Sequence, residues 1–427
     1  MISEVETKYG ESFCCAPWNT VWTGSNGDIK FCCASTDVLG NIKDRPIEEI
    51  YNSTKAKELR LQFLKGEKPE GCSSCWEKES GGTSIGHARE LSNKQGKNVI
   101  DDSIAHTLWD GSLTKQNLKF VDLIWTNKCN FACLHCVPWL SSTISNNYKS
   151  VFPIWLGHDE RNTFEEYNDP EKFNNNRKLE FILSNSHQLE EIHFNGGEPF
   201  LQTETFILLE ELIKLPHHKN IRIWFHTNGS VKTYKNIDIV DDYLAKWQGK
   251  VQMVMSHDHF GERGEYFRYG YKENKWLENF HRFKDAGIET SLETSLTIFN
   301  VLTLDKLFLW YKNQGILDYA AFPSLNYIVS PEIWNFLNLG FDSELKKLTE
   351  DALINAGKLV SYPRMYKDWY MNIQNCLELL TKDYDYVKLY EKFIPSIIAL
   401  DEKRNTNFLK TFPELTLLYE KLNDQPV

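Results

Sequence analysis

The placement of the cysteines is the feature that most limits what this chain can fold into. The chain has ten cysteines in 427 residues, and nine of them lie in the first third of the sequence in tight groups. The groups are Cys14 and Cys15, Cys32 and Cys33, Cys72 and Cys75, and Cys129, Cys133 and Cys136, while Cys376 stands alone. Because the first residues carry Glu4 and Glu6 and no basic, apolar secretion signal, we expect a cytoplasmic location. Thiols stay reduced there, so clustered cysteines indicate metal binding rather than disulfides.

Composition argues against two other classes of protein. The chain has 48 Lys and Arg residues and 59 Asp and Glu residues, which gives a net charge of −11. Proteins that bind nucleic acid carry a basic face, so this charge argues against a nucleic-acid partner. No apolar run approaches the roughly 18 residues of a membrane span, so we expect no membrane partner. At about 150 residues per domain, the length predicts two or three domains.

The middle of the chain alternates strand and helix patterns. Strands are predicted to begin near Leu118, Leu189, Asn220, Val251, Ile288 and Leu317. Most intervals between them are close to the roughly 31 residues per unit of a (β/α)₈ barrel. The longest interval contains an insertion near residues 137–185, rich in Trp, Tyr and Asn, where we expect some aromatic side chains to line a substrate cleft. The pattern predicts an α/β protein with a partial (β/α)₆ TIM-like barrel at 118–330 and a helical C-terminal region at 331–427.

The N-terminal segment predicts a small separate module over residues 1–80. WNTVW and IKFCC flank an Asn-Gly turn, which is a strong hairpin signal. A helical pattern follows with a break at Asn52-Ser53, and the segment ends in GCSSCW. A polar, glycine-containing connector is predicted at 81–117.

The segment TNKCNFACLHC follows the first barrel strand and spaces Cys129, Cys133 and Cys136 as C-x₃-C-x₂-C. A loop this short can direct three sulfurs at one centre, and thiolates select zinc, copper(I) or iron–sulfur clusters. A closed zinc site is the alternative, but it needs a fourth ligand, and strain disfavours ligation by His135 beside Cys136. A four-iron cluster on three thiolates leaves one iron open to a substrate. Barrel folds carry their chemistry at this end of the strands.

This loop resembles the motif of the radical S-adenosylmethionine (SAM) superfamily, and the resemblance covers most of the chain. It implies a reducible 4Fe–4S cluster on the three cysteines, with SAM bound to the open iron through its amino and carboxylate groups. One electron then cleaves SAM to methionine and a 5′-deoxyadenosyl radical. The residue before the third cysteine is usually aromatic in the family; here it is His135, which the resemblance places near the adenine.

Two strand-end motifs add to the resemblance. Gly196-Gly197-Glu198 follows the second strand and resembles the GGE motif that binds the methionine amino group of SAM. Glycines allow close approach to the backbone, and a carboxylate accepts from an ammonium. A tight turn before a helix is the plainer interpretation of this tetrapeptide with Pro199. The segment 227–229, Thr-Asn-Gly, closes the third strand and is supporting evidence only.

The fourth strand supplies further candidates for binding SAM. Ser256 ends this strand and Arg268 follows twelve residues later. The pair resembles the family residues that hold the ribose and carboxylate of SAM, and an arginine suits a carboxylate because its planar fork donates two parallel hydrogen bonds. Asp258 is a further ribose candidate.

The N-terminal module resembles the SPASM/twitch auxiliary-cluster modules of radical SAM enzymes. The resemblance rests on a C-x₁₁-G-x₄-C hairpin followed by C-x₂-C, and it implies a second 4Fe–4S cluster on Cys15, Cys32, Cys72 and Cys75. Zinc is the alternative. Two auxiliary clusters would need eight thiolates, more than the module offers, so one is predicted. The module usually follows the barrel, whereas here it precedes it.

Cys376 lies in an apolar helical pattern, which is typical of a packed cysteine. The resemblance offers a second interpretation, since some radical SAM peptide epimerases use an isolated cysteine as hydrogen-atom donor.

The prediction is therefore a radical SAM enzyme with two 4Fe–4S clusters. The resemblance favours a ribosomal peptide or protein side chain as substrate, with oxidation, cross-linking or epimerisation as the reaction, and an electron donor such as flavodoxin or ferredoxin. The alternatives are a twitch-type dehydrogenase of a sugar or nucleoside, and a non-catalytic metal-binding or electron-transfer protein.

Overall fold

The computed structural model describes residues 4–80, 88–151, 175–319, 321–328, 331–359 and 363–423. The chain divides into two compact units. The first comprises residues 1–127, 166–226 and 233–252, and the second comprises 128–165, 227–232 and 253–427. The limits of these units differ from the domain boundaries predicted at 80, 117 and 330, because both units contain strands of the predicted barrel.

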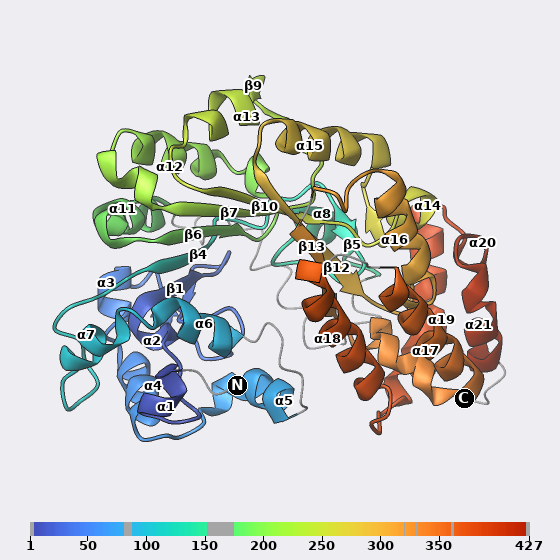
Figure 1. Ribbon diagram of the computed structural model, residues 1–427, viewed down its shortest axis with the longest axis horizontal. Helices are drawn as coiled ribbons and strands as arrows, with labels where there is room; N and C mark the ends of the chain where they lie inside the picture. Colours follow the sequence, from blue (N-terminus) through green and yellow to red (C-terminus); the bar gives the residue numbers. More distant parts are fainter. Residues whose placement is uncertain are drawn as a thin grey trace. The chain divides into compact units, whose positions relative to one another are not determined.

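The first unit is built on a sheet with the strand order β7-β6-β4-β1-β2-β3. These strands are β1 (Thr20–Thr23), β2 (Asp28–Lys30), β3 (Gly40–Asn41), β4 (Phe120–Ile124), β6 (Glu191–Asn195) and β7 (Arg222–Thr227). Figure 1 labels four of these strands, β7, β6, β4 and β1. The pairs β4–β6 and β6–β7 are parallel. Burial alternates along β6 and β7, so one face of the sheet is buried, as the two-residue period of a strand requires.

The predicted N-terminal hairpin is present. β1 and β2 pair antiparallel with Trp22 opposite Lys30, and Gly27 in the turn has a φ of +88°, a conformation that favours glycine. β1 also pairs in parallel with β4, so the hairpin extends the sheet rather than standing apart from it. The edge of β4 would otherwise carry unpaired N–H and C=O groups.

The predicted helix with a break at Asn52-Ser53 is also present. The Ser53 side chain accepts from the backbone N–H of Ala56 and caps the second part of this helix. Two helices, α6 and α7, lie in the segment predicted as a connector. The helices of this unit are α1 (Glu4–Tyr9), α2 (Ala16–Asn19), α3 (Ile47–Ile50), α4 (Thr54–Leu64), α5 (Ser73–Ser80), α6 (Ala88–Gly96), α7 (Ile100–Ala105), α11 (Asn175–Asn185), α12 (Thr203–Ile213) and α13 (Ile239–Asp242). Short elements complete it: η1 (Glu70–Cys72), η4 (Ser186–Gln188), η5 (Pro199–Leu201), η6 (Pro216–Asn220), η7 (Leu244–Lys246), β8 (Thr233–Tyr234) and β9 (Ile237–Asp238).

The second unit contains the remaining barrel strands in the order β10-β12-β13. These are β10 (Val251–Ser256), β12 (Glu289–Leu296) and β13 (Ala321–Tyr327), and β12 pairs in parallel with β13. A two-stranded ribbon joins β5 (Ala132–Cys133) to β11 (Arg268–Tyr269). All six predicted strands are therefore present, and the α/β class is confirmed.

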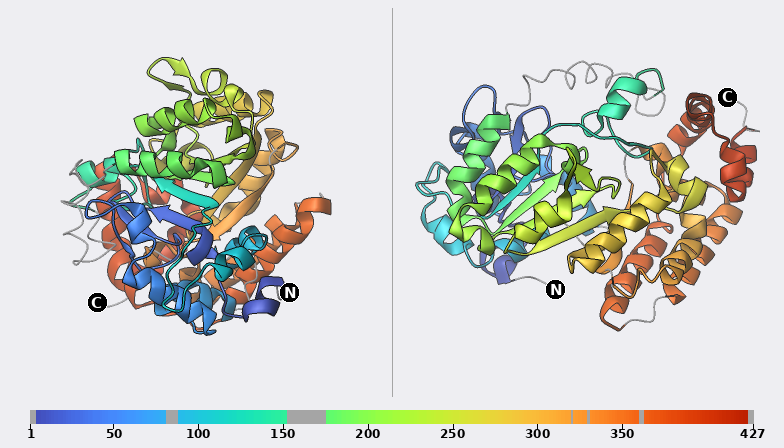
Figure 2. Two further views of the ribbon diagram at one scale, coloured as in Figure 1. Left: turned by 90° about the vertical axis from the view of Figure 1, so that its left-hand side faces the viewer. Right: turned by 90° about the horizontal axis from the view of Figure 1, so that it is seen from above.

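The other elements described in the second unit are helices, and the predicted helical C-terminal region is confirmed (Figure 2). They are α8 (Ser142–Asn147), α14 (Gly261–Phe267), α15 (Glu273–Asp285), α16 (Leu304–Asn313), α17 (Ser343–Lys358), α18 (Pro363–Leu379), α19 (Val387–Arg404), α20 (Phe408–Thr411) and α21 (Thr416–Asn423), with η8 (Val301–Thr303), η9 (Glu332–Trp334), η10 (Phe336–Phe341) and η11 (Pro413–Leu415). Within the described part of the chain, no helix has both the length and the apolar character needed to cross a bilayer. The centre of the predicted aromatic insertion, residues 152–174, lies outside the described residues.

Candidate functional site

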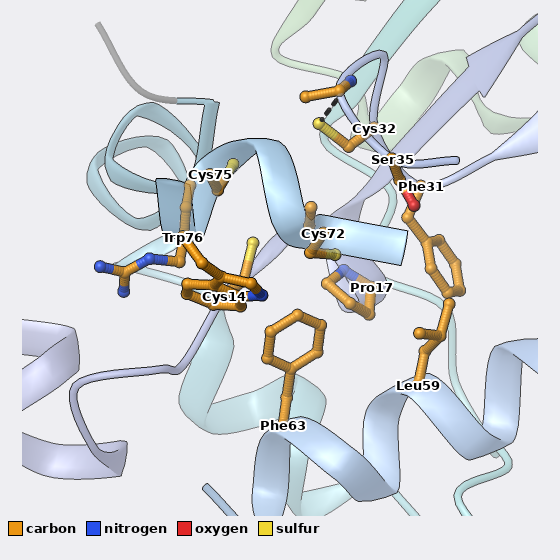
Figure 3. A pocket seen from close by; sticks show the side chains of 13 residues that line it. Cys14, Pro17, Phe31, Cys32, Ser35, Leu59, Phe63, Cys72, Cys75 and Trp76 are labelled. Atoms are coloured by element: carbon orange, nitrogen blue, oxygen red, sulfur yellow. Dashed lines mark hydrogen bonds between the residues drawn. The ribbon is translucent and has the colours of Figure 1, made fainter. Parts of the chain in front are cut away.

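In the first unit, four cysteines line one cavity with mostly apolar walls (Figure 3). Cys14 precedes α2, Cys32 follows β2, and Cys72 and Cys75 lie in η1 and α5. The hairpin turn and the helices that follow thus bring together thiols that are far apart in the sequence. The other side chains that line the cavity include Pro17, Phe31, Leu59, Phe63 and Trp76.

The structure places Cys14 in this cavity, where the sequence analysis chose Cys15. Cys15 packs against α6 instead, since a Cβ added at Gly96 would lie 2.6 Å from the Cys15 Cβ and 3.0 Å from its Sγ. The Cys15 backbone N–H also donates to Asn93 Oδ1 at 2.8 Å. Of the pair 32/33, Cys32 lines the cavity, as predicted from its spacing to Gly27. Tertiary packing of α6, rather than residue spacing, separates Cys14 from Cys15.

The surroundings of this cavity disfavour free thiolates. Burial raises the pKa of Cys72 to about 11, and it raises the pKa of Cys14 as well. Arg89 also lines the cavity, but its charge is met by Glu79, at 2.7 Å from Nε, and by Glu6, at 2.8 Å from Nη1. Because only a deprotonated thiol ligates metal, a cation or cluster must offset this burial when it binds.

In the second unit, the three-cysteine loop is held from two sides. On one side β5 pairs with β11, which sets Cys133 opposite Arg268. On the other side, hydroxyl groups at the start of α8 bind the loop backbone: Ser141 Oγ donates to Phe131 O at 2.6 Å and Thr143 Oγ1 to Cys129 O at 2.8 Å. The loop geometry is therefore fixed by protein contacts.

Two side chains direct N–H groups at the sulfurs of this loop. Arg268 Nη1 lies 3.7 Å from Cys133 Sγ, and Asn228 Nδ2 lies 3.9 Å from Cys129 Sγ. Asn228 belongs to the Thr-Asn-Gly segment, in which Gly229 has a φ of +71° and packs so closely against Trp276 that a Cβ would lie 2.6 Å from its ring. Donors to thiolate sulfur stabilise metal-bound cysteines and tune a cluster.

Arg268 and Asp258 form a buried ion pair. Arg268 Nε lies 2.5 Å from Asp258 Oδ2, and the Asp258 Oδ1 accepts from the backbone N–H of Ser295 at 2.7 Å. Burial opposes the charge on Arg268, but Asp258 and then Cys133 outweigh it and raise the arginine pKa. Burial also raises the pKa of Cys133, and Arg268 opposes that shift. The two predicted SAM-binding residues thus contact each other beside the cysteine loop.

His135 is half-buried beside Cys136 and stacks on Phe267, with ring centroids 5.2 Å apart. Burial, with a smaller effect from Arg268, lowers its pKa well below the ordinary value, so its ring is neutral near pH 7. Its Nε2 lies 3.5 Å from Ser295 Oγ, while its buried Nδ1 has no hydrogen-bond partner among the described residues. Buried polar atoms usually have a hydrogen-bond partner, so this ring nitrogen is suited to form a hydrogen bond with a bound ligand.

The remaining candidates lie at strand ends, as predicted. In the first unit, Gly196 and Gly197 follow β6 with φ values of +67° and +55°, and a Cβ at Gly196 would lie 2.5 Å from Ile124 Cγ2. Glu198 is fully buried and accepts from the backbone N–H of Phe200 at 3.3 Å. In the second unit, Ser256 ends β10, and its carbonyl accepts from Trp276 Nε1 at 3.2 Å.

Cys376 is buried in α18, and burial raises its pKa to about 12. Its thiol therefore stays protonated near neutral pH. A protonated thiol is compatible both with simple packing and with hydrogen-atom donation. The role of Cys376 as a hydrogen-atom donor therefore stays a prediction.

The cysteines of the loop and of the cavity fit iron–sulfur clusters, because thiolates are the ligands that hold such clusters. None of the ten cysteines forms a disulfide, so all of these sulfurs could serve as ligands. The orphaned Nδ1 of His135 and the donors on Cys129 and Cys133 also suit a cluster with a ligand beside it.

Three contacts were not predicted from the sequence. The sequence signal for Asn228 is its position in the segment that closes the third strand. For Cys14 the signal is weaker, because residue spacing favours its neighbour Cys15. Arg404, which donates to the carbonyl of Ala132 inside the loop at 2.7 Å, gave no sequence signal because 272 residues separate the two.

Comparison with known proteins gives two family matches. Residues 123–307 match the model of the radical SAM superfamily, and residues 14–76 match the SPASM iron–sulfur cluster-binding domain. The radical SAM cyclopropyl synthase TigE of Paramaledivibacter caminithermalis is 27% identical over 249 residues. These residues are 57% of this chain but only 46% of that relative, so the chain spans less than half of its length.

Solved structures are more distant. SuiB of Streptococcus suis bound to precursor peptide SuiA is 12% identical with a TM-score of 0.38, over 70% of this chain and 63% of that one. The structure of anSMEcpe with bound AdoMet is 18% identical with a TM-score of 0.38, over 56% of this chain and 60% of that one.

Proposed function

We propose that this chain, which carries a radical SAM domain and a SPASM iron–sulfur domain, is an enzyme that removes a hydrogen atom from a peptide or protein side chain. When bound, the loop cluster supplies the electron that cleaves SAM to methionine and a 5′-deoxyadenosyl radical, which takes the hydrogen atom from the substrate.

The observation that carries the proposal is the cysteine loop itself. Three thiols are held in a backbone pinned by β11 and α8, with N–H donors aimed at the sulfurs of Cys129 and Cys133. Each donor stabilises sulfur as a ligated thiolate. A set of three thiolates leaves one iron without a protein ligand, and that vacancy is what a chelating amino acid such as the methionine part of SAM requires.

The chain's other residues would orient SAM. Arg268 uses Nε for Asp258 and Nη1 for Cys133, which leaves Nη2 to bind the SAM carboxylate. His135 is neutral, its Nδ1 meets no hydrogen-bond partner in the described ranges, and its ring would face the adenine. Ser256 of the same unit would bind the ribose. Glu198 stays the predicted acceptor for the methionine ammonium on its motif alone, next to glycines that permit close approach.

In the first unit, Cys14, Cys32, Cys72 and Cys75 would hold the second 4Fe–4S cluster. Four protein ligands leave no open iron, and the walls of the cavity are mostly apolar. We therefore assign this cluster to electron transfer, where it would accept an electron from the substrate radical that hydrogen-atom abstraction leaves, as that radical becomes the oxidised product.

The choice of a peptide or protein substrate rests on the presence of radical SAM and SPASM domains in one chain, a combination that resembles peptide-modifying enzymes. The reaction class we propose is oxidation, cross-linking or epimerisation, with flavodoxin or ferredoxin as external reductant.

Anaerobic reconstitution tests the cofactors. The protein is loaded with iron and sulfide, reduced, and incubated with SAM. About eight irons per chain and formation of 5′-deoxyadenosine are expected. The variant Cys129→Ala, Cys133→Ala, Cys136→Ala is the control, and it should keep about half the iron and make no 5′-deoxyadenosine. Two zinc ions per chain without SAM cleavage would overturn the proposal.

Mass spectrometry tests the substrate class. Candidate peptides from short genes beside this one are incubated with the reduced enzyme and SAM in deuterated buffer. Loss of two hydrogens indicates oxidation or a cross-link, and deuterium uptake indicates epimerisation. Reaction with a sugar or nucleoside, and none with peptides, would instead favour the small-molecule dehydrogenase.

A further inference from the structure

Arg404 ends α19 in the C-terminal region, yet its side chain reaches the cysteine loop of the same unit. It is 7% exposed. Nη2 donates to Ala132 O at 2.7 Å, Nη1 to Tyr266 O at 2.8 Å, and Nε to Tyr148 OH at 3.1 Å. Ala132 lies directly before Cys133, so one guanidinium fixes the carbonyl beside a cysteine of the loop.

The charge of Arg404 has no carboxylate partner within the described part of the chain. Its three acceptors are two carbonyls and a phenol, and its remaining contacts are the rings of Tyr148 and Tyr269, at 5.2 and 5.0 Å from the guanidinium carbon. Arg268 differs, because Asp258 neutralises it at 2.5 Å. Of the two buried arginines at the loop, Arg404 therefore contributes the uncompensated charge.

Burying such a charge is unfavourable unless something nearby offsets it. Two aromatic rings and the C-terminal end of α19 offset it in part, since a helix end carries partial negative charge. Arg404 also interacts electrostatically with Cys133. Thiolates holding a cluster are the negative partner that is missing from this arrangement, and their negative charge increases when the cluster gains an electron.

We propose that Arg404 is a positioning residue that fixes the cysteine loop through Ala132 and makes the loop cluster easier to reduce by placing an uncompensated positive charge beside Cys133. The inference rests on the proposed function, because it requires a cluster on this loop. It ties the C-terminal helices, outside the radical SAM match at 123–307, to the electron transfer that starts the reaction.

The test compares Arg404→Met, Arg404→Lys and Arg263→Met. Arg263 is the matched control: it pairs with Glu414 in the C-terminal region, with Nη2 2.8 Å from Oε2, and lies over the ring of Phe412. Each variant is reconstituted without oxygen. Three quantities are measured: the iron content, the midpoint potential of the cluster whose electron paramagnetic resonance signal changes on SAM addition, and the rate of iron loss to a chelator.

Arg404→Met should shift that potential to a more negative value and lose iron about 10–100-fold faster, as for supporting residues around metal sites. Arg404→Lys should restore the potential, because the charge remains, but not the iron retention, because a single ammonium cannot replace the three directed donors. Arg263→Met should change neither quantity, even where it lowers the melting temperature.

The outcomes separate the two proposals. If the wild-type protein forms no SAM-responsive cluster, the proposed function fails. If it forms one, and Arg404→Met has the wild-type potential and iron retention, the role of Arg404 is overturned and the proposed function stands. Should Arg404→Met fail to fold, Arg404→Lys decides: wild-type iron retention in that variant overturns the role of Arg404.

Discussion

The three-cysteine loop of the second unit and the four-cysteine cavity of the first unit present the same ligand type among different side chains. Charged and polar side chains, Arg268 and Asn228, point N–H donors at the loop sulfurs. Mostly apolar side chains line the cavity, where the backbone N–H of Ala34 donates to Cys32 Sγ at 3.4 Å and Arg89 is neutralised by two glutamates. Ligand count differs as well, with three thiols in one place and four in the other.

Under the proposed function, this difference teaches how one chain could assign two roles to two similar clusters. Polar donors and a missing ligand suit a cluster that must bind a charged cofactor and accept an electron. A full ligand set in apolar walls suits a cluster that only relays an electron, because nothing can bind the iron directly. The predictions below test whether the two places are as distinct as their surroundings indicate.

The largest expected effect is at the loop. Cys133→Ser should reduce 5′-deoxyadenosine formation to the level of cluster-free protein, since the cluster that binds SAM loses a ligand. Iron should fall by about half, because the cavity keeps its own cluster. Liquid chromatography of the products and iron analysis measure both effects. Normal SAM cleavage by this variant would show that the loop is not the catalytic site.

The next effect distinguishes Cys14, which lines the cavity, from its neighbour Cys15, which does not. Cys14→Ser should lose the auxiliary cluster and about half the iron while SAM is still cleaved. Cys15→Ser is the matched variant and should keep both clusters, because Cys15 packs against Gly96 outside the cavity. Iron analysis of the two proteins decides. The reverse pattern would restore the assignment made from sequence spacing.

A smaller effect, on stability, is expected at the ion pair beside the loop. Asp258→Asn should lower the unfolding free energy by about 3–5 kcal/mol, because it leaves Arg268 buried without a carboxylate. Glu414→Gln provides the comparison, since it breaks a more exposed arginine pair and should cost at most about 1 kcal/mol. Urea unfolding of both variants measures the difference. Equal losses would mean that burial does not distinguish the two pairs.

The smallest effect is expected in the scaffold of the first unit. Lys178 is buried in α11 and donates to the carbonyls of Gly24, Ile124 and Trp125 at 2.9, 2.7 and 3.2 Å. Lys178→Met should cost about 3 kcal/mol, because the buried carbonyls lose the N–H donors of the lysine. Iron content should not change, since no cysteine is touched. Urea unfolding and iron analysis check both expectations.

The pKa of Lys178 also predicts that the unfolding free energy depends on pH. Burial lowers its pKa to about 7 from an ordinary value of 10.5. Between these values the unfolded chain binds more protons than the folded one, so the stability of the wild-type protein should rise with pH in that interval. The difference in unfolding free energy between wild type and Lys178→Met, measured at pH 7 and pH 9, isolates this effect. A difference that is constant with pH would contradict it.

Features that depend on near neighbours in the chain were predictable. The six barrel strands, the Asn-Gly hairpin and the Asn52-Ser53 break lie where periodicity and turn residues indicated. In the proposed site, the C-x₃-C-x₂-C spacing and the strand-end position of Gly196-Gly197-Glu198 were visible in the same way, because both are local.

Long-range choices were not predictable. The sequence separations from Cys14 and from Cys15 to any other cysteine differ by only one residue. The sequence pattern therefore could not separate the two, whereas the packing of Cys15 against Gly96 of α6 does. Likewise, nothing in the pattern tied β1 to β4 or placed two helices in the segment expected to be a connector.

The sequence by itself determined the kind of chemistry, since a short loop with three thiols constrains the ligand set wherever it folds. Only the tertiary structure decided the electrostatics of that loop: which arginine is neutralised, which one keeps its charge, and which amide faces a sulfur. The physical reason is that charge interactions depend on distance and burial, and both are set by packing between segments as far apart as Ala132 and Arg404.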